Sequence, residues 1–241
     1  DNIMKKERLT KRLALFTALT LTGAMLAGCG NTDAAESSSD AQTGVTADTQ
    51  AAAGDASADV VYRTLDEIKE SGTINIGVFS DKNPFGYVDE NGEYQGYDVY
   101  FANRLAKDLG VDVNFVSTEA ASRIEYLQTG KVDVILANFT VTPERAEEVD
   151  FALPYMNVSL GVISPDSAVV ESLDDLTADD PVIVISGTTA ETYLTETYPD
   201  LTLQKYDSYA AAKTALENGS GVAWANDNTE VIAFALQNPG Y

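Results

Sequence analysis

Two segments of the sequence place anion-binding groups at the start of a predicted helix. Residues 140–145 (Thr-Val-Thr-Pro-Glu-Arg) follow an apolar run, with Thr142 as a helix N-cap and Pro143 at the first helical position. The positive end of that helix and the guanidinium of Arg145 suit a carboxylate. Residues 186–189 (Ser-Gly-Thr-Thr) repeat this arrangement later in the chain. Taken alone, the threonines of both segments are better explained as ordinary helix caps.

One carboxylate complements these two anion sites. Asp227 ends the last predicted strand, where it could accept hydrogen bonds from an ammonium group. Two anion sites and one carboxylate are what a zwitterionic α-amino acid requires. The alternative is that Arg145 is a solvated charge, as a single arginine in a first helical turn more often is.

The composition excludes several other kinds of chemistry. The 241 residues contain no histidine and one cysteine, so Ser-His-Asp hydrolysis, Cys-His proteolysis, histidine-ligated zinc and an internal disulfide are all excluded. We therefore predict no catalytic residues, no metal and no cofactor. The formal net charge of −23 disfavours binding to nucleic acid. Hydrophobic residues make up 44% of the chain, which is typical of a folded protein.

Alternating strands and helices are predicted beyond residue 60. The Asn91-Gly92 pair indicates a hairpin turn, and the apolar run 132–137 predicts a strand that is buried on both faces. The predicted strands cover residues 73–79, 111–116, 132–137, 159–164, 182–186, 201–206 and 222–225. The predicted helices cover residues 64–72, 99–109 and 122–128, begin after 142 and at 189, and cover 209–217 and 229–236.

These repeated strand–helix units fall into two series and predict two α/β lobes with parallel sheets. We place the first lobe at residues 61–158 and the second at 159–241. A ligand is expected in the crevice outside the carboxyl ends of the strands, which is where Arg145 and Asp227 lie in the sequence.

The amino-terminal residues are predicted to be a processing signal. A basic stretch from Lys5 to Arg12 precedes an apolar run that is too short for a transmembrane helix, so residues 1–28 are interpreted as a signal peptide. Residues 26–29 (Leu-Ala-Gly-Cys) resemble a bacterial lipobox, which predicts acylation of Cys29; the alternative is an incidental thiol. Residues 29–60 are then a lipid-anchored flexible tether, because they are rich in Ser, Thr, Ala and Asp.

Three longer segments carry a resemblance to a known family. Residues 96–110, 127–146 and 149–155 resemble the polar amino-acid substrate-binding proteins of ABC importers, solute-binding protein family 3. The resemblance runs from about Tyr62 to the end of the chain. It implies a type II periplasmic-binding-protein fold, in which a hinge joins the lobes and a return segment completes the first lobe. The chain ends at Tyr241 before that return, so we expect an incomplete first lobe.

The resemblance also implies roles for individual residues. Thr140, Arg145 and the backbone of Thr189 would hold the ligand carboxylate. Asp227 and the backbone of Asn138 would hold the ammonium group. Arg123 matches a position that reaches the ligand side chain in several members. Phe79 and Tyr87 would be pocket walls, with ordinary core packing as an equally good explanation.

The resemblance further implies the partners and the location. A non-enzymatic, monomeric lipoprotein on the extracytoplasmic face of the membrane would pass its ligand to an ABC permease and ATPase. Residues 77–90, 137–140 and 227–229 look most like the cysteine-binding branch, so L-cysteine is preferred to glutamate or aspartate. Lys82 keeps the acidic ligands open, because it could supply a second basic group. Less favoured functions are those of a sensory or adhesin ectodomain and of a cyclohexadienyl-dehydratase-like enzyme.

Overall fold

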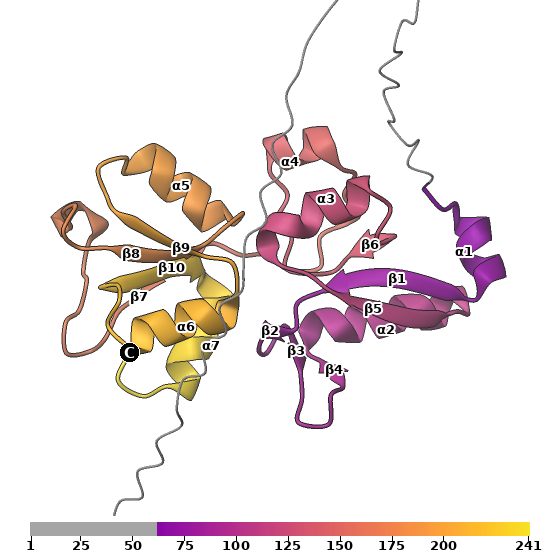
Figure 1. Ribbon diagram of the computed structural model, residues 1–241, viewed down its shortest axis with the longest axis horizontal. Helices are drawn as coiled ribbons and strands as arrows, with labels where there is room; N and C mark the ends of the chain where they lie inside the picture. Colours follow the sequence, from indigo (N-terminus) through magenta and orange to yellow (C-terminus); the bar gives the residue numbers. More distant parts are fainter. Residues whose placement is uncertain (1–61) are drawn as a thin grey trace, which may run out of the picture. The chain divides into compact units, whose positions relative to one another are not determined.

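The computed structural model describes residues 62–241, which form an α/β structure (Figure 1). The predicted signal peptide, Cys29 and the tether lie outside the described residues. Within residues 62–241, no helix combines the length and the apolar character needed to cross a membrane.

The first lobe is built on a parallel sheet with the strand order β5-β1-β6. Helix α2 packs against β1 and β5, whereas α3 contacts β6 (Figure 1). The elements of this sheet and its helices are α1 (Leu65–Ser71), β1 (Thr73–Val78), α2 (Tyr97–Leu109), β5 (Asp112–Ser117), the 3₁₀ turn η1 (Ala120–Ser122), α3 (Arg123–Gln128), β6 (Val134–Ile135) and α4 (Pro143–Glu148).

A small antiparallel sheet follows β1 in the same lobe. It consists of β2 (Asp81–Lys82), β3 (Gly86–Val88) and β4 (Tyr94–Gln95) in that spatial order. The turn at Asn91-Gly92 joins β3 to β4, as predicted, with Val88 opposite Tyr94. This sheet brings Asp81 and Lys82 close to the second lobe, where Asp81 contacts Ala210.

The second lobe has a four-stranded sheet with the order β7-β10-β8-β9. Helix α5 covers one face, and α6 and α7 cover the other (Figure 1). The elements are β7 (Leu160–Ile163), the 3₁₀ turn η2 (Leu173–Asp175), β8 (Val182–Ile185), α5 (Thr189–Thr197), β9 (Leu203–Tyr206), α6 (Tyr209–Glu217), β10 (Ala223–Asp227) and α7 (Asn228–Gln237). Strands β8, β9 and β10 are parallel as predicted, but β7 runs antiparallel to β10. Only the 3₁₀ turn η2, and no α-helix, lies between β7 and β8, so β7 is not part of a strand–helix–strand crossover.

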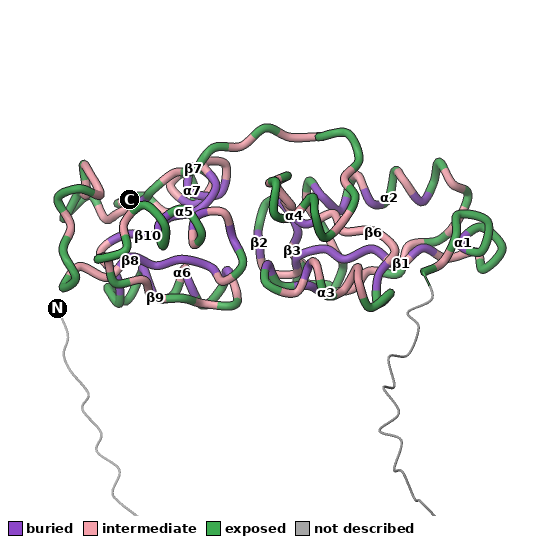
Figure 2. Tube along the Cα trace, turned by 90° about the horizontal axis from the view of Figure 1, so that it is seen from above, coloured by how far each residue is buried: buried purple, intermediate pink, exposed green. Residues whose placement is uncertain are grey.

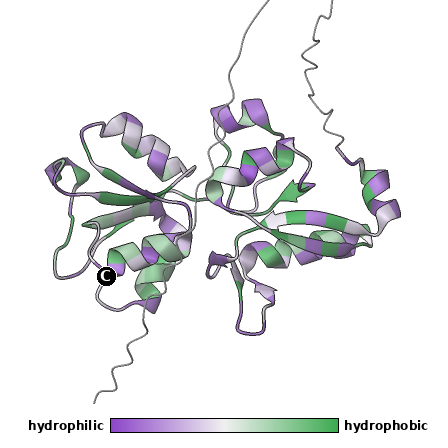
Figure 3. Ribbon diagram, in the orientation of Figure 1, coloured by the Kyte–Doolittle hydropathy of each residue, from purple (hydrophilic) through white to green (hydrophobic). Residues whose placement is uncertain are grey.

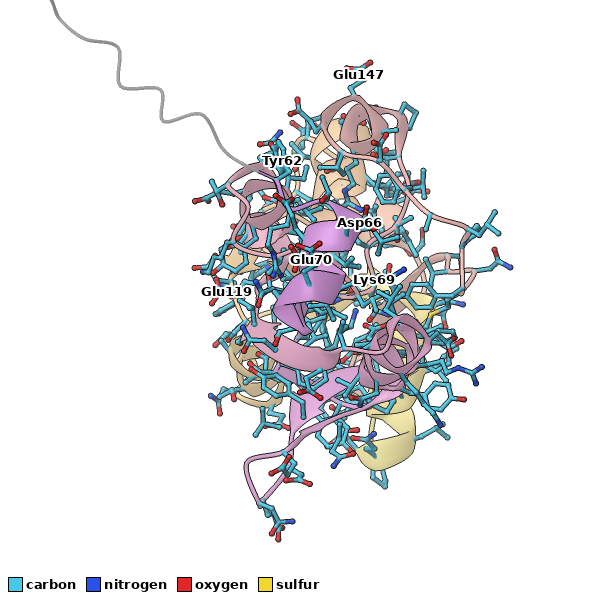
Figure 4. All side chains as sticks on the ribbon, turned by 90° about the vertical axis from the view of Figure 1, so that its right-hand side faces the viewer. Tyr62, Asp66, Lys69, Glu70, Glu119 and Glu147 are labelled. Atoms are coloured by element: carbon cyan, nitrogen blue, oxygen red, sulfur yellow. The ribbon has the colours of Figure 1, made fainter. Side chains whose placement is uncertain are left out.

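Side-chain caps fix the starts of several helices. Thr64 and Glu67 form a capping box at the start of α1, and the hydroxyl of Ser208 accepts from Ala211 N at the start of α6. Figure 4 looks onto α1, whose charged side chains project outward while Ile68 is buried. These caps agree with the predicted helix starts.

The apolar residues form separate cores within the lobes and one cluster that joins them. Strands β8 and β10 are buried along their whole length, and β1 is buried over its last three residues (Figure 2). Strand β8 is also strongly hydrophobic (Figure 3). One cluster combines Phe79 and Ala137 of the first lobe with Ile183, Tyr209 and Trp224 of the second. Packing therefore links the two sheets across the lobe boundary that we predicted at residue 158, and that boundary itself stays a prediction.

The sequence predicted a strand buried on both faces over residues 132–137, but the strand is shorter and less buried than that. Only β6 forms there, and Val134 and Ile135 are half-buried. Among the described residues β6 pairs with β1 alone, so its other edge borders no strand. A cavity of about 530 Å³, lined mainly by apolar residues of β6 and of segment 149–158, lies along it.

A buried carboxylate ties the start of α2 to the segment that leads into the second lobe. The Asp98 carboxylate accepts from the Tyr155 hydroxyl at 2.8 Å and from Asn138 N at 3.1 Å. Burial raises the pKa of Asp98 from 3.8 to about 6, and these hydrogen bonds only partly oppose that shift. Asp98 is therefore a structural carboxylate that loses its proton at a higher pH than an ordinary aspartate.

Asp98 should make the free energy of unfolding depend on pH. The folded state keeps the Asp98 proton up to about pH 6, whereas the unfolded chain releases it near pH 3.8. Raising the pH from 5.0 to 7.5 should therefore lower the free energy of unfolding by about 1.4 kcal/mol through this group. In the Asp98→Asn variant, the free energy of unfolding measured with urea at pH 5.0 and 7.5 should lack this pH-dependent contribution. The exposed Asp112→Asn serves as the control; equal pH dependence in both variants would contradict the assignment.

Candidate functional site

Two arginines of the first lobe converge on one backbone carbonyl of the second. Arg123 Nη2 donates to the Gly187 carbonyl oxygen at 3.0 Å, and Arg145 Nη2 donates to the same oxygen at 2.9 Å. Both guanidinium groups also lie over the Phe139 ring, at 4.5 and 4.7 Å from its centre. The structure thus brings together two predicted site residues and the Ser186–Thr189 segment.

Arg123 is fully engaged with backbone acceptors. It is 3% exposed, and it donates through Nε to Ala120 O and through Nη1 to the carbonyls of Ala137 and Asn138. These acceptors are neutral, so none of them offsets the cost of burying the charge. Burial and the neighbouring Arg145 therefore lower the pKa of Arg123 to about 10.

Arg145 projects from the first turn of α4. Thr142 caps this helix through a hydrogen bond from Arg145 N, and Pro143 has no N–H, so the helix start offers few free amides. The guanidinium donates to the Thr140 carbonyl at 2.7 Å. Burial lowers the pKa of Arg145. The anion-binding capacity of this segment therefore resides in the side chain more than in the helix end.

The start of α5 lies next to the shared carbonyl. Thr188 caps the helix by accepting from Glu191 N, and Glu191 in turn accepts from Gly187 N at 2.6 Å. No described residue accepts from the backbone N–H of Thr189. This amide is the donor that the sequence predicted for a ligand carboxylate.

Asp227 ends β10 and is 7% exposed. It interacts electrostatically with both Arg123 and Arg145, and it partly opposes the lowering of their pKa values by burial. Its Oδ2 lies 3.6 Å from Lys82 Nζ. No described residue donates a hydrogen bond to the Asp227 carboxylate, so both oxygens can still accept.

Lys82 is the cation of the first lobe that faces Asp227. Its side chain is fully buried, and Nζ lies 4.5 Å from the centre of the Tyr209 ring, with Phe79 and Phe85 at 5.4 and 5.3 Å. Burial alone would lower the pKa of Lys82, but Tyr209, Glu230 and Asp227 raise it above its ordinary value. The ammonium group therefore stays charged inside the structure.

The remaining predicted site residues, Asn138, Phe79 and Tyr87, differ in whether they lie next to the charged groups around Gly187. Asn138 adopts φ 42°, and its buried amide atoms have no partner among the described residues. Phe79 is 1% exposed and packs edge-on against Tyr209 at 5.1 Å. Phe79 is therefore a core residue that also flanks Lys82, and its role as a pocket wall stays a prediction. Tyr87 is half-buried in β3, and none of its side-chain contacts joins it to the group around Gly187.

Three further contacts between the lobes were not predicted. Asp81 Oδ2 accepts from Ala210 N at the start of α6, at 3.0 Å. Tyr209 supplies a ring to Lys82, and Gly187 approaches so closely that an added Cβ would lie 2.6 Å from Ala121 Cα. The predicted start of α6 at residue 209 is the only sequence signal for any of them. Contacts between residues of different lobes join positions far apart in the chain, so they leave no local pattern in the sequence.

The cavity beside β6 is not part of this polar group. Of the predicted binding residues only Asn138 and Thr140 line it, and its other walls are mainly apolar. Residues 62–241 also contain no cluster of three or more carboxylate, histidine or cysteine side chains suited to a metal ion. The charged groups that face one another lie around Gly187 and Asp227.

Two solved structures share this architecture, and a third protein is similar in sequence. A crystal structure of the solute receptors for L-cysteine of Neisseria gonorrhoeae is 52% identical, with a TM-score of 0.72, over 74% of this chain and 73% of that chain. The cysteine-binding protein of Campylobacter jejuni is 49% identical, with a TM-score of 0.71, over 73% and 72%. The ABC transporter glutamine-binding protein of Bacillus subtilis is 32% identical over 192 residues, which cover 78% of this chain and 70% of that protein.

The resemblance inferred from the sequence and the predicted two-lobed α/β fold are both confirmed by these similarities. Residues 74–233 match the family model, which covers more than half of the chain. This chain therefore belongs to the bacterial extracellular solute-binding proteins, family 3.

Proposed function

We propose that this chain binds a polar L-amino acid between its two lobes, with L-cysteine preferred to glutamate and aspartate. The observation that carries this proposal is the convergence of Arg123 and Arg145 on the Gly187 carbonyl, with the Asp227 carboxylate nearby. Groups of opposite charge at one place suit a zwitterion.

In the proposed complex, the ligand carboxylate replaces the Gly187 carbonyl oxygen as the acceptor of hydrogen bonds from the guanidinium groups. A carbonyl oxygen is a neutral acceptor, and a carboxylate forms stronger, charge-assisted hydrogen bonds with the same guanidinium donors. Arg145 is the main partner, with Thr140 beside it and the unpartnered N–H of Thr189 as a donor from the second lobe. Binding of one carboxylate by both lobes favours their closure.

The ligand ammonium group is held by Asp227 and the Asn138 carbonyl. The Asp227 oxygens receive no hydrogen bond from described residues, and a backbone carbonyl that already accepts from Arg123 has a second lone pair. The ligand side chain then points toward Arg123 and Phe79, with Tyr87 as a more distant wall.

The similarity to two proteins described as binding cysteine supports cysteine. The aromatic ring of Phe79 beside one guanidinium also suits a small, polarizable side chain. Glutamate or aspartate is the second candidate, because the buried ammonium of Lys82 adds a second positive charge.

Delivery to an ABC permease and ATPase is the role that family membership supports. We further propose that acylated Cys29 anchors the chain to the extracytoplasmic face of the membrane, as a monomer. Dehydratase activity is disfavoured, because Asp227, the candidate general acid among the site residues, is assigned to the ligand ammonium. A sensory or adhesin ectodomain would use the same binding residues without a permease.

Calorimetry on the full chain under reducing conditions tests the ligand assignment. Cysteine should bind with a Kd of about 1 μM or tighter, and glutamate at least tenfold more weakly, a difference of about 1.4 kcal/mol. The reversed order would overturn the choice of cysteine but keep the amino-acid site. No binding by any amino acid would overturn the proposed function.

Gly187→Ala tests whether approach of the lobes is needed for binding. The added Cβ would lie 2.6 Å from Ala121 Cα, so the lobes cannot approach as closely, and affinity should fall at least tenfold. Gly219→Ala is the matched control, because Gly219 also has a positive φ, +70° against +77°, but an added Cβ meets nothing within 4 Å. Equal losses of affinity in the two variants would point to backbone strain instead of lobe separation.

Cys29→Ala tests the anchor. The variant should lose labelling by a fatty-acid analogue and leave the membrane fraction, because the acylated residue is gone. Cys29→Ser is a second variant with the same expectation. Membrane retention of both variants without label would contradict the lipid anchor.

A further inference from the structure

The charges around the proposed ligand site do not balance. Three buried or half-buried cations of the first lobe, Lys82, Arg123 and Arg145, face the second lobe. Asp227 is the carboxylate that interacts with all three. Buried charges without an opposite charge are costly, so this excess requires an explanation.

The other acidic groups nearby do not remove the excess. Glu230 is fully buried and also acts on Lys82, but it lies 3.0 Å from Lys213 and forms a neutral pair with it. Asp98 acts on Lys82 and Arg123, but it is held by Tyr155 and Asn138, away from hydrogen-bond contact with either cation. Glu144 also acts on Arg145, but it is exposed to solvent, which screens its charge. Even with Asp98 ionised, the three cations therefore face only two buried carboxylates, Asp98 and Asp227.

An ordinary zwitterion would leave this excess unchanged. Its carboxylate and ammonium groups cancel, so the net charge of the site is the same before and after binding. A ligand with one further negative charge on its side chain would remove the excess. Lys82 and Arg123 both approach the Phe79 ring, at 5.4 and 5.8 Å, so this ring marks the place where that charge would sit.

Building on the proposed function, we propose that cysteine is bound with its side chain as a thiolate facing Lys82 and Arg123. Free cysteine in solution at neutral pH carries mainly a neutral thiol, with a pKa of about 8.5. On binding, the S–H bond breaks, the electron pair stays on sulfur and the proton is released to the buffer. No oxidant or reductant is involved.

The physical basis is the response of a thiol to nearby cations. Neighbouring lysine or arginine groups lower a thiol pKa to between about 3.5 and 7.5 in proteins. Lys82 cannot leave the site easily, because Tyr209, Phe79 and Phe85 surround its ammonium group. The site therefore selects cysteine over serine, whose hydroxyl does not ionise at this pH.

Proton release measured by calorimetry tests this proposal on the unmodified full chain. Binding enthalpies of cysteine and of serine are measured at pH 7.5 in buffers with different ionisation enthalpies. The slope should show about 0.9 more protons released with cysteine than with serine. Serine corrects for titration of Asp98, Tyr209, Tyr155 and other protein groups, which both ligands share.

The outcomes separate this proposal from the proposed function. A difference below about half a proton with cysteine still bound overturns the thiolate and keeps the amino-acid site. If glutamate binds and cysteine does not, the ligand assignment and the thiolate both fail. S-methylcysteine should behave like serine, because its sulfur carries no proton.

A variant identifies the cation responsible. Lys82→Met keeps an unbranched side chain of similar length among the rings and removes the charge. Cysteine affinity should fall at least tenfold more than serine affinity, whereas the exposed Lys107→Met should leave both unchanged. Equal losses for cysteine and serine would overturn the role of Lys82.

Discussion

The structure depends on two arginines whose guanidinium groups are buried against neutral acceptors. Arg123 and Arg145 share the Gly187 carbonyl, and through that oxygen the first lobe meets the second. Gly187 can accept both donors because its backbone has φ +77° and lacks a Cβ that would strike Ala121. The contact is satisfied, but it is weaker than a pairing of the same donors with an anion.

Around this contact, the two lobes contribute different polar groups, and both contribute apolar rings. The first lobe supplies the cations Lys82, Arg123 and Arg145, and the second supplies the acceptors Gly187 and Asp227. Aromatic rings from both lobes fill the space between them. Neither lobe alone neutralises its own charged groups, so the site exists only where the two lobes meet.

The sequence predicted the local elements well because caps and periodic patterns act over a few residues. Thr64, Thr142 and Ser208 mark helix starts where the structure has them. The sequence was less informative where contacts between residues distant in the chain determine the local structure. Residues 132–137 form only a short strand, whose second edge has no partner among the described residues. The sequence also carried no sign that Lys82 is fully buried among the rings of Phe79, Phe85 and Tyr209. Apart from the predicted start of α6, the contact between Asp81 and Ala210 leaves no signal in the sequence.

The apolar cluster shared by the lobes makes the strength of their contact depend on temperature. Separating the lobes would transfer Phe79, Tyr209 and their neighbours from a packed environment to water. Exposure of apolar surface raises the heat capacity, and apolar contacts weaken on cooling. The apolar part of the contact between the lobes therefore weakens on cooling, whereas the hydrogen bonds to Gly187 do not share that dependence on apolar hydration.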